Sequence, residues 1–193
     1  MHSSKTLGVV LVGLLLISMT SVVIAIPWDT ISDDPTPAQA VWVEPKVTGC
    51  LTVGETFVVD VLVNVTAPTS AAGTGMMGWE YKLFWDPSVI NVTSYVLNVP
   101  PGMVGFLVKD DWSILGRHYY AYTNLMGATF TGVASLCTYT FEVVGDGGSS
   151  LGLQDVKIVD DTATVFITDV SPGAGTVLNG VYCPEALQYQ LTI

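Results

Sequence analysis

The strongest structural signal in this chain is the stretch Gly78–Ile90, GWEYKLFWDPSVI. Large apolar or aromatic residues occupy every second position from Trp79 to Trp85, and polar Glu80 and Lys82 lie between them. A period of two residues is typical of a β-strand that buries one face. Asp86-Pro87-Ser88 then ends the strand, because proline fixes φ and has no N–H to donate to a neighbouring strand.

The two-residue period recurs along the chain from Val41 onward, and clusters of Gly, Pro, Asn and Asp separate the segments. We predict strands at Phe57–Val65, Gly78–Trp85, Val89–Leu97, Met103–Lys109, His118–Thr123, Leu136–Val144, Leu151–Val159, Ala163–Val170 and Thr176–Cys183. No stretch outside the N-terminus predicts an amphipathic helix. About nine short strands of this kind are typical of an all-β sandwich or jelly roll, in which two stacked sheets bury their apolar faces.

The alternating rings of Gly78–Ile90 have two possible roles. We expect them to fill the seam between the two sheets, since they share a face with Leu83. A row of exposed rings would instead stack on sugar rings, as in a carbohydrate-binding module, and this alternative stays open. Phe84 falls on the opposite face with Glu80 and Lys82, where an exposed aromatic side chain suits contact with a protein partner.

The N-terminus predicts export from the cytoplasm. Lys5 is followed by an uncharged apolar run that ends near Ile26. This pattern is typical of a secretory signal cleaved after Ala25, or of an N-terminal hydrophobic helix that stays as an anchor. We expect a secreted or cell-surface protein that meets the membrane only through this segment.

Four regions follow from this pattern. Residues 1–25 are the signal peptide or anchor. Residues 26–40, with three prolines and three aspartates, form a linker. Residues 41–183 form the β-sandwich. Residues 184–193 are a C-terminal tail or an extra strand.

The chain is strongly acidic, with a formal net charge of −11. Such a surface repels nucleic acid, and no nucleic-acid partner is expected. No cofactor is predicted, although calcium is possible because three acidic doublets occur and calcium prefers oxygen ligands. The loop carboxylates to test for calcium are Asp110, Asp111, Asp160 and Asp161.

The three cysteines do not have the spacing of a zinc site. Cys137 shares the face of Tyr139 and Phe141 in a predicted strand, which indicates a buried thiol. Cys50 precedes the first strong strand and Cys183 follows the last. Because the first and last strands of a sandwich often lie side by side, we predict a Cys50–Cys183 disulfide.

Two N-glycosylation sequons occur, at Asn64 and Asn91. No pattern of catalytic residues stands out. His118 is the only histidine after the N-terminal segment, and no G-x-S-x-G motif occurs. Glu80 and Glu142 face outward on regular strands, where a catalytic acid would lack a cleft. We therefore expect a protein that is not an enzyme.

Several segments resemble a cohesin domain, known from cellulosome scaffolds and from archaeal exported proteins. They are VGETFVVDVLV from Val53, GWEYKLFWDPSVINV from Gly78, ASLCTYTFEVVG from Ala134 and LGLQDVKIVDDTATVF from Leu151. The resemblance implies a nine-stranded jelly roll without catalysis, one sheet face of which binds a calcium-loaded dockerin on a partner. On this chain the matching face includes Glu80, Lys82 and Phe84.

Three functions are compatible with these features. The chain is a recognition or adhesion module for a dockerin-like protein partner, a module that binds polysaccharide at the cell surface, or a structural subunit of a surface filament or layer. In the third case Ile26–Val43 or Leu187–Ile193 would pair with the sheet edge of a neighbouring molecule.

Overall fold

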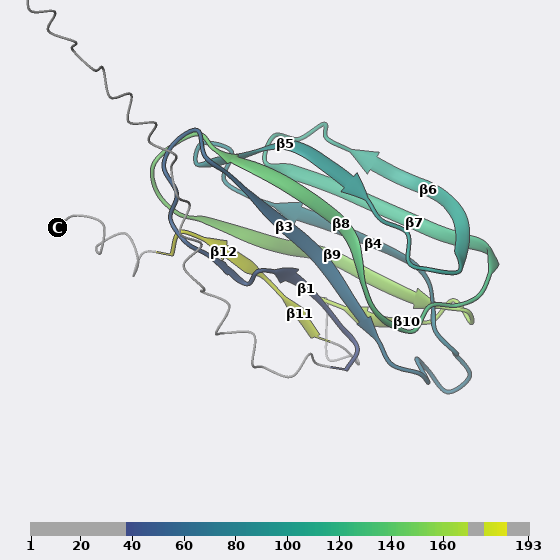
Figure 1. Cartoon of the computed structure of the whole chain (residues 1–193). Coiled ribbons are helices and arrows are strands. Elements are labelled where there is room, and N and C mark those ends of the chain that lie inside the picture. The colour runs from purple at the N-terminus through teal and green to yellow at the C-terminus, as the bar shows by residue number, and fades with distance from the viewer. Residues whose placement is uncertain (1–37, 170–175, 185–193) are drawn as a thin grey trace, which may run out of the picture.

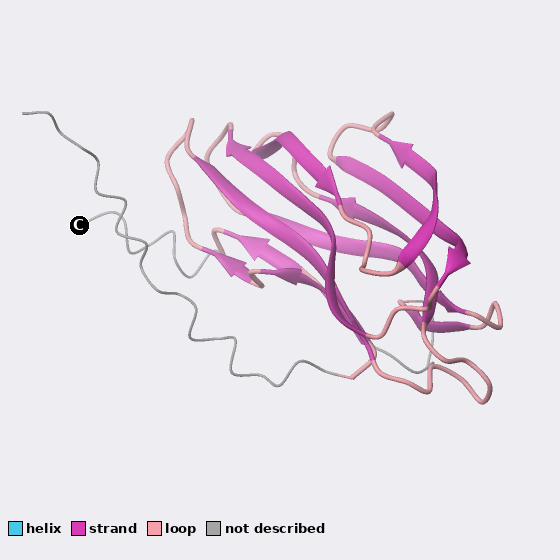
Figure 2. Cartoon of the chain, turned by 45° about the vertical axis from the view of Figure 1, so that its right-hand side comes forward, coloured by secondary structure: helices cyan, strands magenta, loops and turns pink. Residues whose placement is uncertain are grey.

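The computed structural model describes residues 38–169 and 176–184 of the chain. The predicted signal or anchor, most of the linker and nearly all of the C-terminal tail lie outside the described residues. Every regular element in the described part is a β-strand (Figure 2). Within these residues no helix is long and apolar enough to cross a membrane.

The described residues form twelve strands in two sheets that face each other (Figure 1). The strands are β1 (Ala40–Glu44), β2 (Val47–Thr48), β3 (Thr56–Val65), β4 (Met76–Phe84), β5 (Ile90–Leu97), β6 (Met103–Asp111), β7 (Arg117–Gly127), β8 (Gly132–Val143), β9 (Ser149–Asp160), β10 (Val165–Thr168), β11 (Thr176–Leu178) and β12 (Gly180–Tyr182). One sheet has five strands in the order β11-β1-β3-β8-β5. The other has seven, in the order β2-β12-β9-β4-β7-β6 with β10 beside β9. The predicted all-β sandwich is confirmed.

The core lies between the sheets and is built from alternate residues of the long strands. Trp79, Tyr81 and Leu83 of β4 and Trp85 just beyond it are at most 7% exposed. The Trp79 ring stacks on Tyr122 of β7, with the ring centroids 4.7 Å apart. Because successive side chains of a strand point to opposite faces, the period of the sequence fixes which side is buried. The prediction that these rings fill the core is confirmed.

Residues 176–183 do not form the single strand that the sequence predicts. β11 pairs with β1 in the five-stranded sheet, whereas β12 pairs with β9 in the other sheet. At the crossing, the side-chain oxygen of Asn179 accepts a hydrogen bond of 2.8 Å from the Leu153 N–H. Gly180 approaches Val43 so closely that an added Cβ would lie 2.6 Å from Val43 Cγ1. The crossing therefore depends on close backbone packing, which periodicity does not reveal.

β1 was not among the predicted strands, and its position corrects one expectation. It lies between β11 and β3, and both of its edges are paired within the chain. Ala40–Val43 therefore cannot pair with the sheet edge of a neighbouring molecule without first leaving its own sheet.

The predicted disulfide between Cys50 and Cys183 is present and joins residues 133 positions apart. β2 and β12, which precede the two cysteines, run parallel and pair Thr48 with Tyr182. The Cys183 N–H donates to the Thr48 carbonyl at 2.9 Å. The disulfide thus joins two segments that backbone pairing also holds together. Cys137 is a buried free thiol, as predicted.

Candidate functional site

The predicted partner-binding residues Glu80, Lys82 and Phe84 lie on the outer face of the seven-stranded sheet. Their strand, β4, lies between β9 and β7, and its alternate residues fill the core. Residues opposite each other on neighbouring strands share a face. Tyr119 of β7 is opposite Lys82, and Lys157 of β9 is opposite Glu80. The structure therefore brings the three predicted residues onto one face.

Charges of opposite sign are paired across this face. Lys157 Nζ contacts Glu80 Oε1, and Lys82 Nζ contacts Asp155 Oδ2. The Tyr119 hydroxyl donates to Glu80 Oε2 at 2.9 Å. Hydrogen bonding to the partner raises the pKa of Lys157 and lowers the pKa of Asp155. Exposed pairs of this kind add little to stability, but they display a defined pattern of charge to a partner.

Phe84 is half-buried, like Glu80 and Lys82, and its role in partner binding stays a prediction. It belongs to an interior strand, with Arg117 opposite on β7 and Gly152 opposite on β9. The exposed ring near this face is Phe106 of β6, which is 49% exposed. It lies opposite Thr123 of β7.

β6 is the edge strand at one side of the seven-stranded sheet, and it exposes apolar side chains. Together with β7 it carries a group of exposed apolar residues on both faces of this edge, which we term the apolar rim. Phe106, opposite Thr123, is on the outer face, whereas Leu107, opposite Tyr122, is on the core side. The residues of the apolar rim are Val104, Phe106, Leu107 and Val108 of β6 and Leu125 and Met126 of β7, which are 45% to 72% exposed. Natural edge strands usually carry charged residues that prevent association. Six uncharged residues in a row at this edge therefore indicate an interaction surface.

Sequence analysis located this strand but missed its exposure. The run Met103–Val108, MVGFLV, has no alternation of polar and apolar residues. An unbroken apolar run is equally typical of a strand that is buried on both faces. The strand order, which places β6 at the edge of its sheet, is what distinguishes the two cases.

A chain of polar groups leads from the end of β6 into the core. Asp110 Oδ1 lies 2.9 Å from His118 Nε2, and His118 Nδ1 lies 2.6 Å from the Tyr139 hydroxyl. The Tyr139 hydroxyl lies 3.0 Å from that of Tyr81. His118, Tyr139 and Tyr81 have no exposed surface. A substrate could not reach this histidine. Its hydrogen bonds therefore satisfy polar groups that are buried in the core.

Burial sets the protonation of this network. Burial is the largest effect on His118 and lowers its pKa, although the neighbouring Asp110 opposes the shift. Burial also raises the pKa of Tyr81 and of Tyr139 far above the usual value. For Asp110, burial acts to raise the pKa, but hydrogen bonds from His118 and two further side chains outweigh it and lower the pKa. At neutral pH a charged carboxylate is therefore bonded to a neutral imidazole.

The four aspartates named for calcium do not converge on one site. Asp110 and Asp111 end β6, which corrects their expected position in a loop. Asp160 ends β9, and Asp161 lies in the turn that follows. β7 and β4 separate these two strands in the sheet. Across the described ranges no group of three or more His, Cys, Asp or Glu side chains could hold a metal ion.

Each doublet has protein partners of its own. Arg117 contacts Asp111 at 3.1 Å. Hydrogen bonds to Ser113 are the largest effect on Asp111 and lower its pKa to about 2. Asp160 accepts a hydrogen bond of 3.1 Å from Thr69, and Asp161 accepts one of 2.8 Å from the Thr74 N–H. A dependence on calcium stays an untested prediction.

The two sequons differ in access. Asn91 is exposed on β5, the edge strand of the five-stranded sheet. Asn64 is half-buried on β3, which has β1 on one side and β8 on the other. Access favours glycosylation at Asn91, and modification of either residue stays a prediction.

Comparison with known proteins supports the fold. No protein-family model matches the chain, and no curated protein matches it. Solved structures do match. The sixth cohesin of scaffoldin B from Acetivibrio cellulolyticus, in complex with a Cel5 dockerin, has a TM-score of 0.56 at 13% identity and covers 76% of this chain and 99% of its own.

Two further cohesins give a similar result. A non-cellulosomal cohesin from the hyperthermophilic archaeon Archaeoglobus fulgidus has a TM-score of 0.51 at 12% identity, over 81% of this chain and 99% of its own. A type II cohesin domain from the cellulosome of A. cellulolyticus has a TM-score of 0.52 at 13% identity, over 80% of this chain and 99% of its own. The chain therefore has a cohesin-like fold, as the resemblance in its sequence implies.

Proposed function

We propose that this cohesin-like chain is a non-catalytic recognition module that binds a protein partner through the outer face of its seven-stranded sheet. A dockerin-like protein is the expected partner, since a cohesin of similar fold is described in complex with a dockerin. The disulfide between Cys50 and Cys183 supports an extracytoplasmic location, because such bonds persist in oxidising compartments.

The observation that carries the proposal is the exposed Phe106 of the apolar rim beside a face of paired charges. Phe106 lies opposite Thr123, and Glu80 and Lys82 lie one strand further into the same sheet. Protein interfaces combine apolar side chains that become buried with polar groups around them that set orientation and specificity. This face offers both, on neighbouring strands of one sheet.

Capture from a surface extract of the source organism, followed by affinity measurement with the captured protein, tests this proposal. Phe106→Glu should weaken binding about tenfold or more, because losing a central interface side chain costs about 2 kcal/mol. Val133→Glu is the matched control. Val133 is 58% exposed but belongs to the five-stranded sheet, so its replacement should leave the affinity unchanged.

A glycan array with the same three proteins tests the carbohydrate alternative. Glycan binding without capture of any protein would contradict the proposal. Equal affinity of wild type and Phe106→Glu for the captured protein would show that another face makes the contact. A dockerin-bearing protein in a neighbouring reading frame would support recognition.

A further inference from the structure

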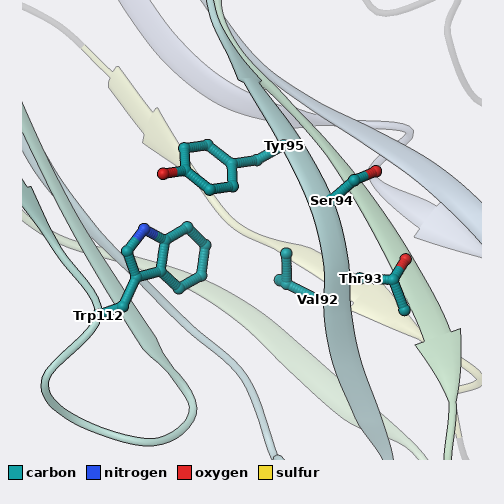
Figure 3. Close-up of a pocket in the computed structure, with 5 residues that line it drawn as sticks. All are labelled: Val92, Thr93, Ser94, Tyr95 and Trp112. Carbon is teal, nitrogen blue, oxygen red and sulfur yellow. The ribbon is translucent and has the colours of Figure 1, made fainter.

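A shallow hollow of about 400 Å³ lies beside β5, lined by residues 92–95 and Trp112 (Figure 3). In Figure 3, Val92 and Tyr95 lie on the Trp112 side of the strand, whereas Thr93 and Ser94 lie on the other side. The Thr93 hydroxyl also donates to the Thr140 carbonyl at 3.2 Å. On the Trp112 side, the hollow therefore offers a ligand two aromatic rings and one apolar side chain, together with the Tyr95 hydroxyl.

Trp112 is held in place from two directions. Its indole stacks on the buried His118 ring, with centroids 4.0 Å apart and planes 11° apart. Its Nε1–H donates to Asp110 Oδ1 at 2.9 Å. One ring face and the polar edge are thus occupied, Tyr95 and Trp85 lie beside the ring, and its remaining exposed part lines the hollow. A ring that is already fixed loses little conformational freedom when a ligand binds.

Tyr95 is oriented by the same carboxylate. Its hydroxyl donates to Asp110 Oδ2 at 2.9 Å, and its ring centroid lies 4.7 Å from that of Trp112. Both rings therefore direct their polar hydrogen to Asp110. A carboxylate that accepts such hydrogen bonds polarises the ring systems, and the negative face of an aromatic ring attracts cations.

Asp110 keeps its negative charge beside this hollow. Among the described residues, its ion contact is with His118. Because burial lowers the pKa of His118, that partner is neutral at neutral pH. Lys109 and Arg117 contact Asp111 instead. The net charge of −11 adds a field that favours cations over anions.

We propose that this hollow binds the guanidinium group of an arginine side chain. A guanidinium is planar and weakly hydrated, so it can stack on an indole face. The charged Asp110, which does not itself line the hollow but bonds to both rings, attracts it. An ammonium group is more strongly hydrated and fits less well. A neutral sugar would gain nothing from the negative charge of Asp110. The hollow lies outside the face proposed for the main partner, so this inference does not depend on that proposal.

Titration of the intact chain with Nα-acetyl-arginine amide, followed by NMR of the indole N–H signals, tests the inference. A Trp112→Phe variant assigns the Trp112 signal. We expect that signal to shift progressively and to approach saturation only at roughly 0.1 M ligand or above, since one exposed cation–π contact is weak. The signal of the buried Trp79 should stay in place.

The matched ligand is Nα-acetyl-citrulline amide, which has nearly the same shape without the charge. It should bind at least about fivefold more weakly, in line with a charge-dependent contact. Equal shifts with the citrulline compound, or no saturable shift of Trp112 with the arginine compound, would overturn the inference. A response to methyl β-glucoside at the same concentration would overturn it too.

Two aspartate variants distinguish the effect of the Asp110 charge on binding from the effect of the net charge of the molecule. Asp110→Asn should weaken binding about fivefold or more, and Asp146→Asn, at an exposed turn, should leave it unchanged. Because Asp110→Asn alters the hydrogen bonds of both rings, its fold is checked by thermal unfolding. Tyr95→Phe, which keeps the ring and loses only the hydroxyl, is the second variant and should weaken binding less. Equal weakening by Asp146→Asn and Asp110→Asn would contradict a specific site.

Discussion

Trp85 is a core residue that lies just beyond the end of β4. It is 7% exposed, and its ring meets Phe141 of the other sheet edge-to-face, with centroids 5.5 Å apart. Trp85→Ala should lower the free energy of unfolding by about 3–5 kcal/mol, because the surrounding core cannot collapse into the space left behind. Chemical denaturation measures this loss.

Phe84→Ala, one position earlier, is the control for that experiment. Phe84 is half-buried on the opposite face, so its replacement should cost less than the Trp85 variant. If both variants lost the same stability, Trp85 would not be the core residue that its burial indicates.

His118 links stability to pH. Burial lowers its pKa in the folded chain, so the unfolded chain binds this proton more readily. Its contribution is complete above the unfolded pKa of about 6.5 and is lost as the pH falls toward the folded value. The free energy of unfolding should therefore decrease between about pH 7.5 and about pH 5.5 in the wild type.

His118→Gln removes this titration. The variant should be less stable at neutral pH, because Asp110 and the Tyr139 hydroxyl lose their partner. Its stability should then vary much less over the same range of pH. Parallel curves for the two proteins would show that other groups cause the dependence.

The crossing between β11 and β12 depends on Gly180. An added Cβ would meet Val43 Cγ1 at 2.6 Å and Val43 Cβ at 3.1 Å, and valine has little freedom to move aside. Gly180→Ala should therefore lower the free energy of unfolding by about 1–3 kcal/mol through overpacking. Gly152→Ala on β9 is the matched control, since nothing lies within 4 Å of its added Cβ. Equal stability of the two variants would contradict a tight crossing.

The position of the long strands, and the buried face of those that alternate, could be predicted from period, but their lengths often could not. β3 and β4 alternate because one face of each packs on the core, and the sequence records that alternation directly. The short strands could not be found in this way. β1 has four fully buried residues in a row, and β11 and β12 have three residues each, too few to show a period. Which strands pair with each other depends on the whole fold, so the pairing of these short strands leaves no pattern in the local sequence.

The candidate site could be predicted only in part, for the same reason. Glu80 and Lys82 belong to a strand with a clear period, so their outward position follows from the sequence. Phe84 and the apolar rim could not be assigned, because exposure there depends on which strand lies at the edge of the sheet. The pair of Trp112 and Tyr95 joins residues from β5 and from the segment after β6, which periodicity does not relate.

The oligomeric state of the molecule separates recognition from the structural-subunit alternative. A net charge of −11 opposes self-association, and Lys109, Asp110 and Asp111 discourage pairing along the end of β6, although the uncharged Met103–Val108 does not. Both edges of β1 are already paired. We expect the chain without residues 1–25 to be monomeric by light scattering, and the further removal of residues 185–193 should not change its mass. Ordered polymers that disappear when residues 185–193 are removed would instead show that this segment pairs with a neighbouring molecule, and recognition would no longer be the favoured function.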